Sequence, residues 1–282
     1  MTLSSRKQLL QKAEQILRQA GTQQPQAEAE FLLAAAQGMS RTHILAFDNI
    51  EVSEKEQEIF WKYIEQKKEG LPVAYITGEA DFGGLVLHSD SRALVPRPET
   101  EELAQYCVNL FERGANPTIL DLCTGSGCIA LYLAAKIPQA YVVGADISSE
   151  ALTLAAENAR LTKLQEKVKW LQSDLFAEVS GTFDLIVSNP PYIPSGDLAG
   201  LSAEVKQEPR QALDGGTDGL DIIRQIVSVV ADYLNPRGTL ALEIGIDEAD
   251  KVAALFDANR WEGGIKKDFA GIDRFVFARL KN

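Results

Sequence analysis

Short apolar segments with strand character alternate with amphipathic helical segments from residue 118 onward, and this alternation constrains the fold more than any other feature. Parallel strands need crossover connections, which are usually helices. Repeated units of this kind predict an α/β fold with a doubly wound, mostly parallel sheet, whose ligands bind at the carboxyl ends of the strands. The predicted strands cover 118–122, 141–145, 168–171, 183–188, 239–244 and 274–278, and the predicted helices cover 128–136, 150–161, 220–234 and 248–258.

The first 74 residues have helical periodicity instead. Apolar residues recur at three- and four-residue spacing over 9–20, and 27–37 is a second such segment that ends at Gly38. A third helix is predicted to begin at Ser53, because Glu56 follows at the spacing of a capping box. We expect a small helical bundle, residues 1–74, without a catalytic constellation of its own. It is either a packing domain or a docking surface for a protein partner.

Residues 75–97 are predicted to form a β-hairpin linker. The segments 75–77 and 85–87 have strand composition, and glycines between them provide the turns. Pro98 then begins a helix whose first turn is rich in glutamate, which suits the positive end of the helix dipole. The largest domain is expected to cover residues 98–282.

The composition restricts the classes of partner and location. The chain has 28 Lys and Arg against 40 Asp and Glu, a formal charge of −12, so it lacks the general basic footprint of a nucleic-acid binder. Three cysteines without metal-ligand spacing and two isolated histidines argue against a metal site. No apolar run has the length of a membrane span, and the first residues lack a signal-peptide core. We expect a cytoplasmic protein with reduced thiols, and neither nucleic-acid nor membrane binding.

Functional residue types follow four of the predicted strands: the glycine-rich loop 123–127, Asp146, Asp174 and Asn189. Because parallel strands end at one edge of the sheet, these residues are expected to share a cleft. The loop fits G-x-G-x-x-A, and Asp146 lies 19 residues after Gly127. Such glycines let a ligand approach the backbone, and the acid accepts hydrogen bonds from ribose hydroxyls. This pattern alone fits both NAD and S-adenosylmethionine.

Two further strand ends favour S-adenosylmethionine. Asp174 is placed to face an adenine amino group, and Asn189-Pro190-Pro191-Tyr192 follows the next strand. Prolines have no N–H, so this motif offers backbone carbonyl oxygens in a stiff frame beside the side-chain oxygen of Asn189. Two acceptors and a flat tyrosine ring suit a planar substrate NH₂ group. The alternative is a proline-rich turn that only ends the strand.

Six segments of the chain resemble the peptide chain release factor glutamine methyltransferases (the PrmC/HemK family), and the resemblance covers nearly the whole chain. It implies a helical N-terminal domain that docks the release factor, a hairpin linker and a class I S-adenosylmethionine-dependent methyltransferase domain. It also implies methylation of the glutamine side-chain nitrogen in the Gly-Gly-Gln motif of class-one release factors, with S-adenosylhomocysteine as product. The segments are 72–79 (PVAYITGE), 95–101 (VPRPETE), 121–127 (DLCTGSG), 189–192 (NPPY), 208–216 (EPRQALDGG) and 242–245 (LEIG).

Together, these arguments assign candidate site residues. The catalytic candidates are Asn189, Pro190 and Tyr192, and Pro191 joins them in binding the substrate. The chain departs from the family at Gly83, where an aromatic residue often follows Phe82, and at Leu175, where some members have tryptophan near the adenine. The cofactor-binding candidates are Cys123, Thr124, Gly125, Ser126, Gly127, Asp146, Asp174, Leu175 and Asn189.

Two alternative functions remain open from the sequence. An adenine-N6 methyltransferase of DNA or RNA would present a similar NH₂ group on a flipped base. The acidic balance and the absence of a Lys/Arg-rich segment near the motif argue against it. A non-catalytic nucleotide-binding interaction protein would keep the glycine loop but would have no use for Asn189-Pro190-Pro191-Tyr192.

Overall fold

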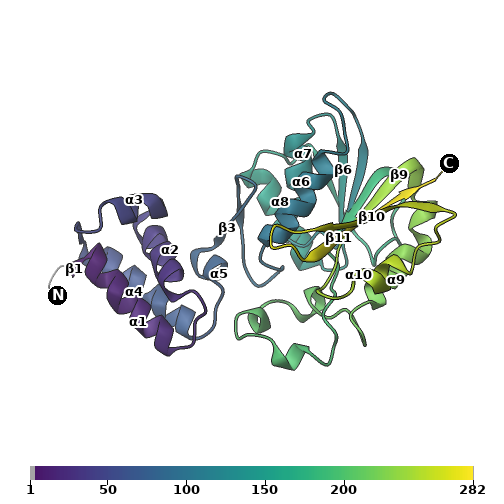
Figure 1. Ribbon diagram of the computed structural model, residues 1–282. Helices are drawn as coiled ribbons and strands as arrows, with labels where there is room; N and C mark the ends of the chain where they lie inside the picture. The colour runs from purple at the N-terminus through teal and green to yellow at the C-terminus, as the bar shows by residue number, and fades with distance from the viewer. Residues whose placement is uncertain (1–3, 282) are drawn as a thin grey trace. The chain divides into compact units, whose positions relative to one another are not determined.

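The computed structural model describes residues 4–281, which form two compact units (Figure 1). Unit 1 contains the chain up to Gly78 together with Ser202–Gln207, and unit 2 contains Glu79–Leu201 and the chain from Glu208 onward. The hairpin predicted as a linker therefore belongs to unit 2, whereas a short piece of the loop after Asn189 belongs to unit 1.

Unit 1 is mainly helical, and the three helices predicted from the sequence are confirmed. Ser53 and Glu56 form both hydrogen bonds of the predicted capping box, and Gly38 ends the second helix in a left-handed conformation. The short helix α3 and the two-residue strands were not predicted, because segments this short carry no periodicity. The elements are β1 (Ser4–Ser5), α1 (Arg6–Gln19), α2 (Pro25–Gln37), α3 (Arg41–Ala46), β2 (Glu51–Val52), α4 (Glu54–Lys68), α5 (Val73–Thr77) and the 3-10 turn η2 (Val205–Gln207).

A strand predicted at 75–77 is wrong, because these residues lie in α5. The carbonyl of Pro72 accepts hydrogen bonds from the N–H groups of Tyr75 (3.0 Å) and Ile76 (3.1 Å), which begins a helical turn. Gly78 ends that turn at φ +77°. The aromatic and β-branched composition indicated a strand, but the local hydrogen bonds of the turn override it. The hairpin instead pairs β3 (Glu79–Phe82) with β4 (Leu85–His88).

Lys67 is buried in unit 1 between two carboxylates. Its Nζ lies 3.0 Å from Glu28 Oε2 and 2.5 Å from Glu204 Oε1, and 1% of its side chain is exposed. Burial raises the pKa of Glu28, while the neighbouring ammonium of Lys67 opposes that shift. Lys67 therefore fastens the segment Ser202–Gln207, which follows the Asn189 motif in the chain, to the helices of unit 1.

Replacing Lys67 with methionine is expected to lower the free energy of unfolding by about 1–3 kcal/mol, because two neighbouring carboxylates lose their shared cation. Urea denaturation measures the change. Lys68→Met is the matched control, since Lys68 pairs with Glu65 alone among residues 4–281 and that pair is exposed, so the change should alter stability by less than about 0.5 kcal/mol. Equal effects of the two substitutions would contradict a structural role for the buried ammonium.

Unit 2 is built on a seven-stranded sheet in the order β10-β11-β9-β8-β5-β6-β7. The five strands from β9 to β7 run parallel, and β10 and β11 pair antiparallel at one edge, so the expected α/β fold is confirmed. The strands are β5 (Thr118–Leu122), β6 (Tyr141–Asp146), β7 (Val168–Gln172), β8 (Phe183–Ser188), β9 (Leu234–Glu243), β10 (Trp261–Lys267) and β11 (Asp273–Leu280). The helices are α6 (Pro98–Val108), α7 (Cys128–Lys136), α8 (Ser149–Leu161), α9 (Asp221–Val229) and α10 (Ala249–Ala253), with 3-10 turns η1 (Leu198–Gly200), η3 (Arg210–Ala212) and η4 (Val230–Asp232).

Two details of unit 2 differ from the sequence prediction. Helices α9 and α10 are shorter than predicted, because Leu234 already belongs to β9 and α10 ends at Ala253. The edge strand β10 was not predicted, because its Gly-Gly pair and charged residues weaken the strand pattern.

Gly83 lies at the hairpin turn, where the Tyr132 ring fills the space: a Cβ on Gly83 would come within 2.1 Å of that ring.

The sheet is packed on both faces. One apolar core joins it to residues of α6, α7 and α8, and a second joins it to residues of α9 and α10. Figure 1 shows these helices beside the strands of unit 2. Among the residues that the structure describes, no helix has the length and hydropathy of a membrane span.

Candidate active site

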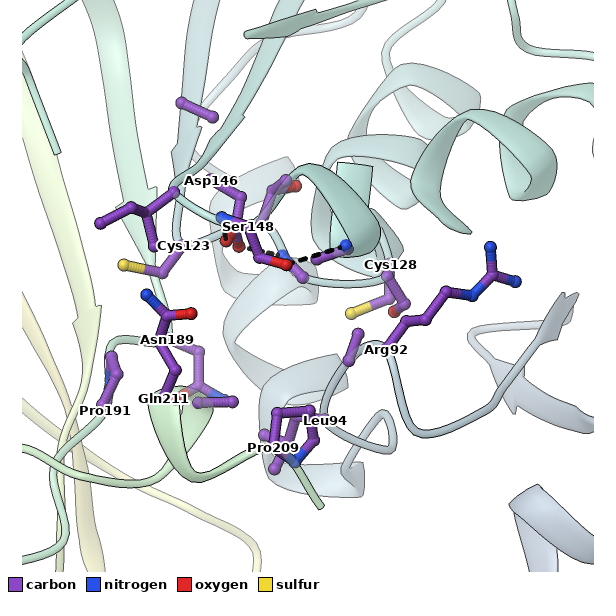
Figure 2. Close-up of a pocket in the computed structure, with 18 of the residues that line it drawn as sticks. Arg92, Leu94, Cys123, Cys128, Asp146, Ser148, Asn189, Pro191, Pro209 and Gln211 are labelled. Carbon is purple, nitrogen blue, oxygen red and sulfur yellow. Dashed lines mark hydrogen bonds between the residues drawn. The ribbon is translucent and has the colours of Figure 1, made fainter. Parts of the chain in front are cut away.

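The register of the sheet brings the functional strand ends together. Leu122 at the end of β5 is paired with Ala145 of β6 on one side and with Ser188 of β8 on the other. The next residues in each chain segment are Cys123, Asp146 and Asn189, so their positions follow from the pairing. They border one cavity of about 650 Å³ in unit 2, which Figure 2 shows with side chains from all three strand ends. This volume is typical of a small-molecule site (about 300–1,000 Å³).

The loop between β5 and α7 turns through left-handed backbone conformations. Cys123 has φ +57°, Gly125 +55° and Gly127 +80°. At Gly127, a Cβ would lie 2.7 Å from the Trp170 ring, so only glycine fits there. A cysteine in this conformation is uncommon, and such local strain concentrates at functional sites.

Asp146 is held by the loop that it faces. Its Oδ2 accepts the N–H of Gly125 and its Oδ1 accepts the N–H of Ser148, both at 2.9 Å. Burial raises the pKa of this carboxyl. Helix α8 is capped by the Ser148 hydroxyl, so capping does not explain Asp146. Each carboxylate oxygen keeps a further lone pair for a ligand hydroxyl.

Asp146→Ala is expected to weaken S-adenosylmethionine binding about 10- to 100-fold, because charge-assisted hydrogen bonds contribute roughly 1.5–3 kcal/mol. Calorimetric titration with the cofactor measures the change, and circular dichroism checks the fold. Asp184→Ala is a control at the opposite end of the sheet, where Asp184 accepts hydrogen bonds from Thr118 at the start of β5. Unchanged affinity in folded Asp146→Ala protein would remove this residue from the site.

The turn after β7 supplies the next cavity residues. Asp174 is exposed and lines the cavity, and Leu175 beside it has φ +47°. The Ser173 hydroxyl donates to the Leu175 carbonyl (2.8 Å) and accepts the N–H of Glu178 (3.0 Å), which holds this turn. Two non-glycine residues in left-handed conformations, Cys123 and Leu175, thus border the same cavity.

Only part of the Asn189-Pro190-Pro191-Tyr192 motif, which follows β8, lines the cavity. Asn189 and Pro191 line the cavity, whereas Pro190 and Tyr192 are not among its lining residues. Asn189 Nδ2 donates to the Thr100 hydroxyl (2.9 Å), and the Tyr192 hydroxyl donates to Glu243 Oε1 (3.4 Å). Burial and the Glu243 carboxylate raise the pKa of Tyr192, so its hydroxyl stays a donor.

The sequence assigned no site residue to two segments that form much of the cavity wall, 91–97 and 209–214. Glu208 joins them: its carboxylate accepts the N–H of Val95 (2.8 Å) and forms an ion pair with Arg97. Residues 95–97 and 209–214 lie in segments that resemble the family, and the loop 193–214 is also expected to line the mouth of the cleft because it follows the Asn189 motif, whereas 91–94 carried no signal. Figure 2 shows Arg92 and Leu94 of the first segment and Pro209 and Gln211 of the second at the cavity.

The three thiols are unsuited to nucleophilic chemistry. Burial raises the pKa of Cys107 and of Cys123, and it raises that of Cys128 to about 12. A thiol with such a pKa stays protonated near neutral pH. Cys123 and Cys128, which line the cavity, therefore serve as small apolar wall residues.

The chemistry of the cavity fits an adenosyl cofactor. Asp146 offers a carboxylate to ribose hydroxyls, and Asp174 offers an acceptor at the adjacent strand end. Below the glycine loop, Asp121 Oδ1 is buried without a hydrogen-bond partner among the described residues, and burial raises the pKa of Asp121 to about 7. The other oxygen of Asp121 accepts hydrogen bonds from the Thr124 hydroxyl and the Ala130 N–H, so this carboxyl holds the glycine loop from beneath and does not itself line the cavity.

The fold and this site define an S-adenosylmethionine-dependent methyltransferase. A family model described as the methyltransferase small domain matches residues 102–217. The crystal structure of a methyltransferase from Pyrococcus furiosus resembles this fold, with a TM-score of 0.51 at 21% identity over 71% of this chain and 90% of that chain.

Curated relatives narrow the class to one family. A release factor glutamine methyltransferase of Deinococcus radiodurans is 42% identical over 96% of this chain and 97% of its own length. One from Moorella thermoacetica is 41% identical over the same shares. The model of the PrmC N-terminal domain matches residues 8–78. The chain belongs to the release factor glutamine methyltransferase family, which confirms the resemblance and excludes the non-catalytic alternative.

Proposed function

We propose that this enzyme methylates the side-chain amide nitrogen of the glutamine in the Gly-Gly-Gln motif of class-one peptide chain release factors. Family membership supports the reaction, and one structural observation supports the acceptor group. The Asn189 Nδ2 donates one hydrogen to the Thr100 hydroxyl, and this bond orients the amide so that its side-chain oxygen is the acceptor at the cavity. An acceptor in this place suits a substrate that brings N–H hydrogens.

The proposed cofactor site consists of the loop 123–127 together with Asp146, Asp174, Leu175 and Asn189. S-adenosylmethionine supplies a methyl group activated by the adjacent positive sulfur. In this proposal the Asp146 carboxylate binds the ribose hydroxyls, and Asp174 accepts from the adenine amino group. The glycine loop allows close approach of the cofactor to the backbone.

The proposed substrate site orients a weak nucleophile. An amide nitrogen reacts poorly because its lone pair is delocalised into the carbonyl. Asn189 Oδ1 accepts one N–H hydrogen and the Pro190 carbonyl accepts the other, which aims the nitrogen at the methyl group. Positive charge develops on the nitrogen during transfer, so both acceptors bind the transition state more tightly than the ground state. The product loses its extra proton after transfer.

Tyr192 and Pro191 complete this proposal. The Tyr192 ring stacks on the amide plane, and its hydroxyl bond to Glu243 limits rotation of the ring. Pro191 forms part of the cavity wall beside Asn189. The assignments of Pro190 and Tyr192 rest on their position in the motif, since neither lines the cavity in the structure.

Incubation of the enzyme with labelled S-adenosylmethionine and a purified release factor tests the proposal. Peptide mapping should locate the label on the glutamine of Gly-Gly-Gln. An adenine-containing oligonucleotide is the competing acceptor, because a flipped base offers a similar NH₂ group. Label on the oligonucleotide and none on the release factor would overturn the protein-substrate assignment. The proposed substrate also implies that the enzyme acts in the cytoplasm and that residues 1–74 dock the release factor. Measuring how tightly the release factor binds an enzyme with a substitution in unit 1 would test the docking role.

A further inference from the structure

The side-chain amide of Asn189 is held by a chain of hydrogen bonds that passes through Thr100, a nearly buried residue at the cavity wall, to the buried Glu243. Its Nδ2 donates to Thr100 Oγ1 (2.9 Å), and Thr100 Oγ1 donates to Glu243 Oε2 (2.7 Å). The other oxygen of Glu243 accepts from the hydroxyl of Tyr192 (3.4 Å). Thr100 at the start of α6 is 3% exposed, and Glu243 at the end of β9 is 1% exposed. Neither was assigned a role by the sequence.

While Glu243 is ionised, the direction of these bonds follows from the donors and acceptors present. An ionised carboxylate can only accept hydrogen bonds, so the Thr100 hydroxyl must donate its single hydrogen to Glu243. The Thr100 oxygen can then only accept, and Asn189 must present its NH₂ to it. Because an amide has its oxygen opposite its nitrogen, the Asn189 oxygen is left for the cavity side. One buried charge thereby determines which way the amide of Asn189 faces.

We propose that Thr100 and Glu243 are positioning residues that keep the Asn189 oxygen directed at the NH₂ of the acceptor amide. This inference rests on the proposed function, since it deepens the role of Asn189 in the same site. Without the chain, the amide is free to rotate and to present NH₂ to the substrate, which repels the substrate's own hydrogens. Such a misplacement lowers turnover without weakening the cofactor site.

The charge of Glu243 makes this chain of hydrogen bonds depend on pH. Burial raises the pKa of Glu243 to about 7, although its hydrogen bond from Thr100 opposes the shift. A protonated Glu243 can donate to Thr100, whose hydroxyl can then donate to the oxygen of Asn189 and reverse the amide. Turnover should therefore fall as the pH decreases through about 7. The ionisable groups that face this carboxyl are Glu99 of α6, Tyr192, Arg274 of β11 and Cys128 of α7.

Substitutions at Thr100 test the positioning role of this chain of hydrogen bonds in the full-length enzyme, with a release factor as acceptor. Thr100→Val should lower kcat roughly 10- to 100-fold, as expected for a misplaced acceptor, with Kd for the cofactor unchanged. Thr100→Ser keeps the hydroxyl and should restore kcat. Thr162→Val is the matched control, because the Thr162 hydroxyl, just after α8, donates to the α8 backbone carbonyls of Asn158 and Ala159 and has no other acceptor in the described part of the chain. It should leave kcat as in the wild type.

Substitution of Glu243 tests the pH dependence. Glu243→Gln can still accept from Thr100 through its amide oxygen, but it does not titrate. The decline in kcat below about pH 7 should be present in the wild type and absent in this variant. Asp121 also has a pKa of about 7, and a decline that persists in Glu243→Gln would point to that group instead.

A readout without turnover separates this inference from the proposed function. The side-chain NH₂ signal of Asn189 in a ¹⁵N–¹H spectrum, assigned by its loss in Asn189→Asp, should shift near pH 7 in the wild type but not in Glu243→Gln. That shift supports the positioning role of Thr100 and Glu243 even if the release factor is not the acceptor. Wild-type kcat in Thr100→Val, an equal loss in Thr100→Ser, or an Asn189 signal that ignores pH would each overturn it.

Discussion

Asn189→Ala is expected to lower kcat for methyl transfer by on the order of 10²–10³, the usual effect of removing one preorganised transition-state hydrogen bond. The variant loses the acceptor that aims the amide nitrogen, whereas Asp146 and the glycine loop remain to bind the cofactor. Single-turnover transfer to the release factor measures the rate, and calorimetry measures cofactor affinity. The affinity should change far less than the rate.

Asn116→Ala is the matched control for that experiment. Asn116 is exposed just before β5, at the amino ends of the parallel strands, so its removal should leave methyl transfer unchanged. Near-normal transfer by Asn189→Ala would show that the motif is only a turn. A large loss of cofactor affinity with no separate effect on the rate would place Asn189 in cofactor binding alone.

The sequence predicted the site where backbone topology determines it. A parallel sheet aligns its strand ends, so a pattern that locates β5, β6 and β8 also places Cys123, Asp146 and Asn189 at one edge. Nothing beyond strand assignment and the rule for strand ends was needed. The same reasoning located the capping box of α4, because that signal is local to four residues.

Residues that join the site through tertiary contacts carry no such signal. Thr100 and Glu243 lie 89 and 54 residues from Asn189, and each is ordinary for its element: a threonine in a first helical turn and the last residue of a strand. Their hydrogen bonds exist only after α6 packs beside β9. Glu208 likewise gains its role by meeting Val95 across more than a hundred residues.

Replacing either glycine of a Gly-Gly-Gln acceptor with a bulky residue is expected to reduce methylation by on the order of 10²-fold or more, because a small misplacement of reacting groups has effects of that size. A glutamine side chain is short, so its neighbours must approach the cavity with it. Pro191, Pro209 and Gln211 border that cavity, and the ion pair of Glu208 with Arg97 restrains the 209–214 segment. Glycines allow this approach because they lack a Cβ.

Replacing the acceptor glutamine with glutamate should abolish methylation, because the carboxylate has no NH₂ and is itself an acceptor facing the oxygen of Asn189. Mass spectrometry of release-factor peptides after incubation with S-adenosylmethionine measures both effects, and a serine-to-alanine change elsewhere on the release factor controls for its folding. The two substitutions separate shape from chemistry. Bulky neighbours should slow a reaction that still occurs, whereas glutamate should leave none. Full methylation of a release factor with bulky residues beside the glutamine would show that the entrance to the site is wide. Equally fast methylation of adenine in an oligonucleotide would place the specificity of the enzyme outside this cavity.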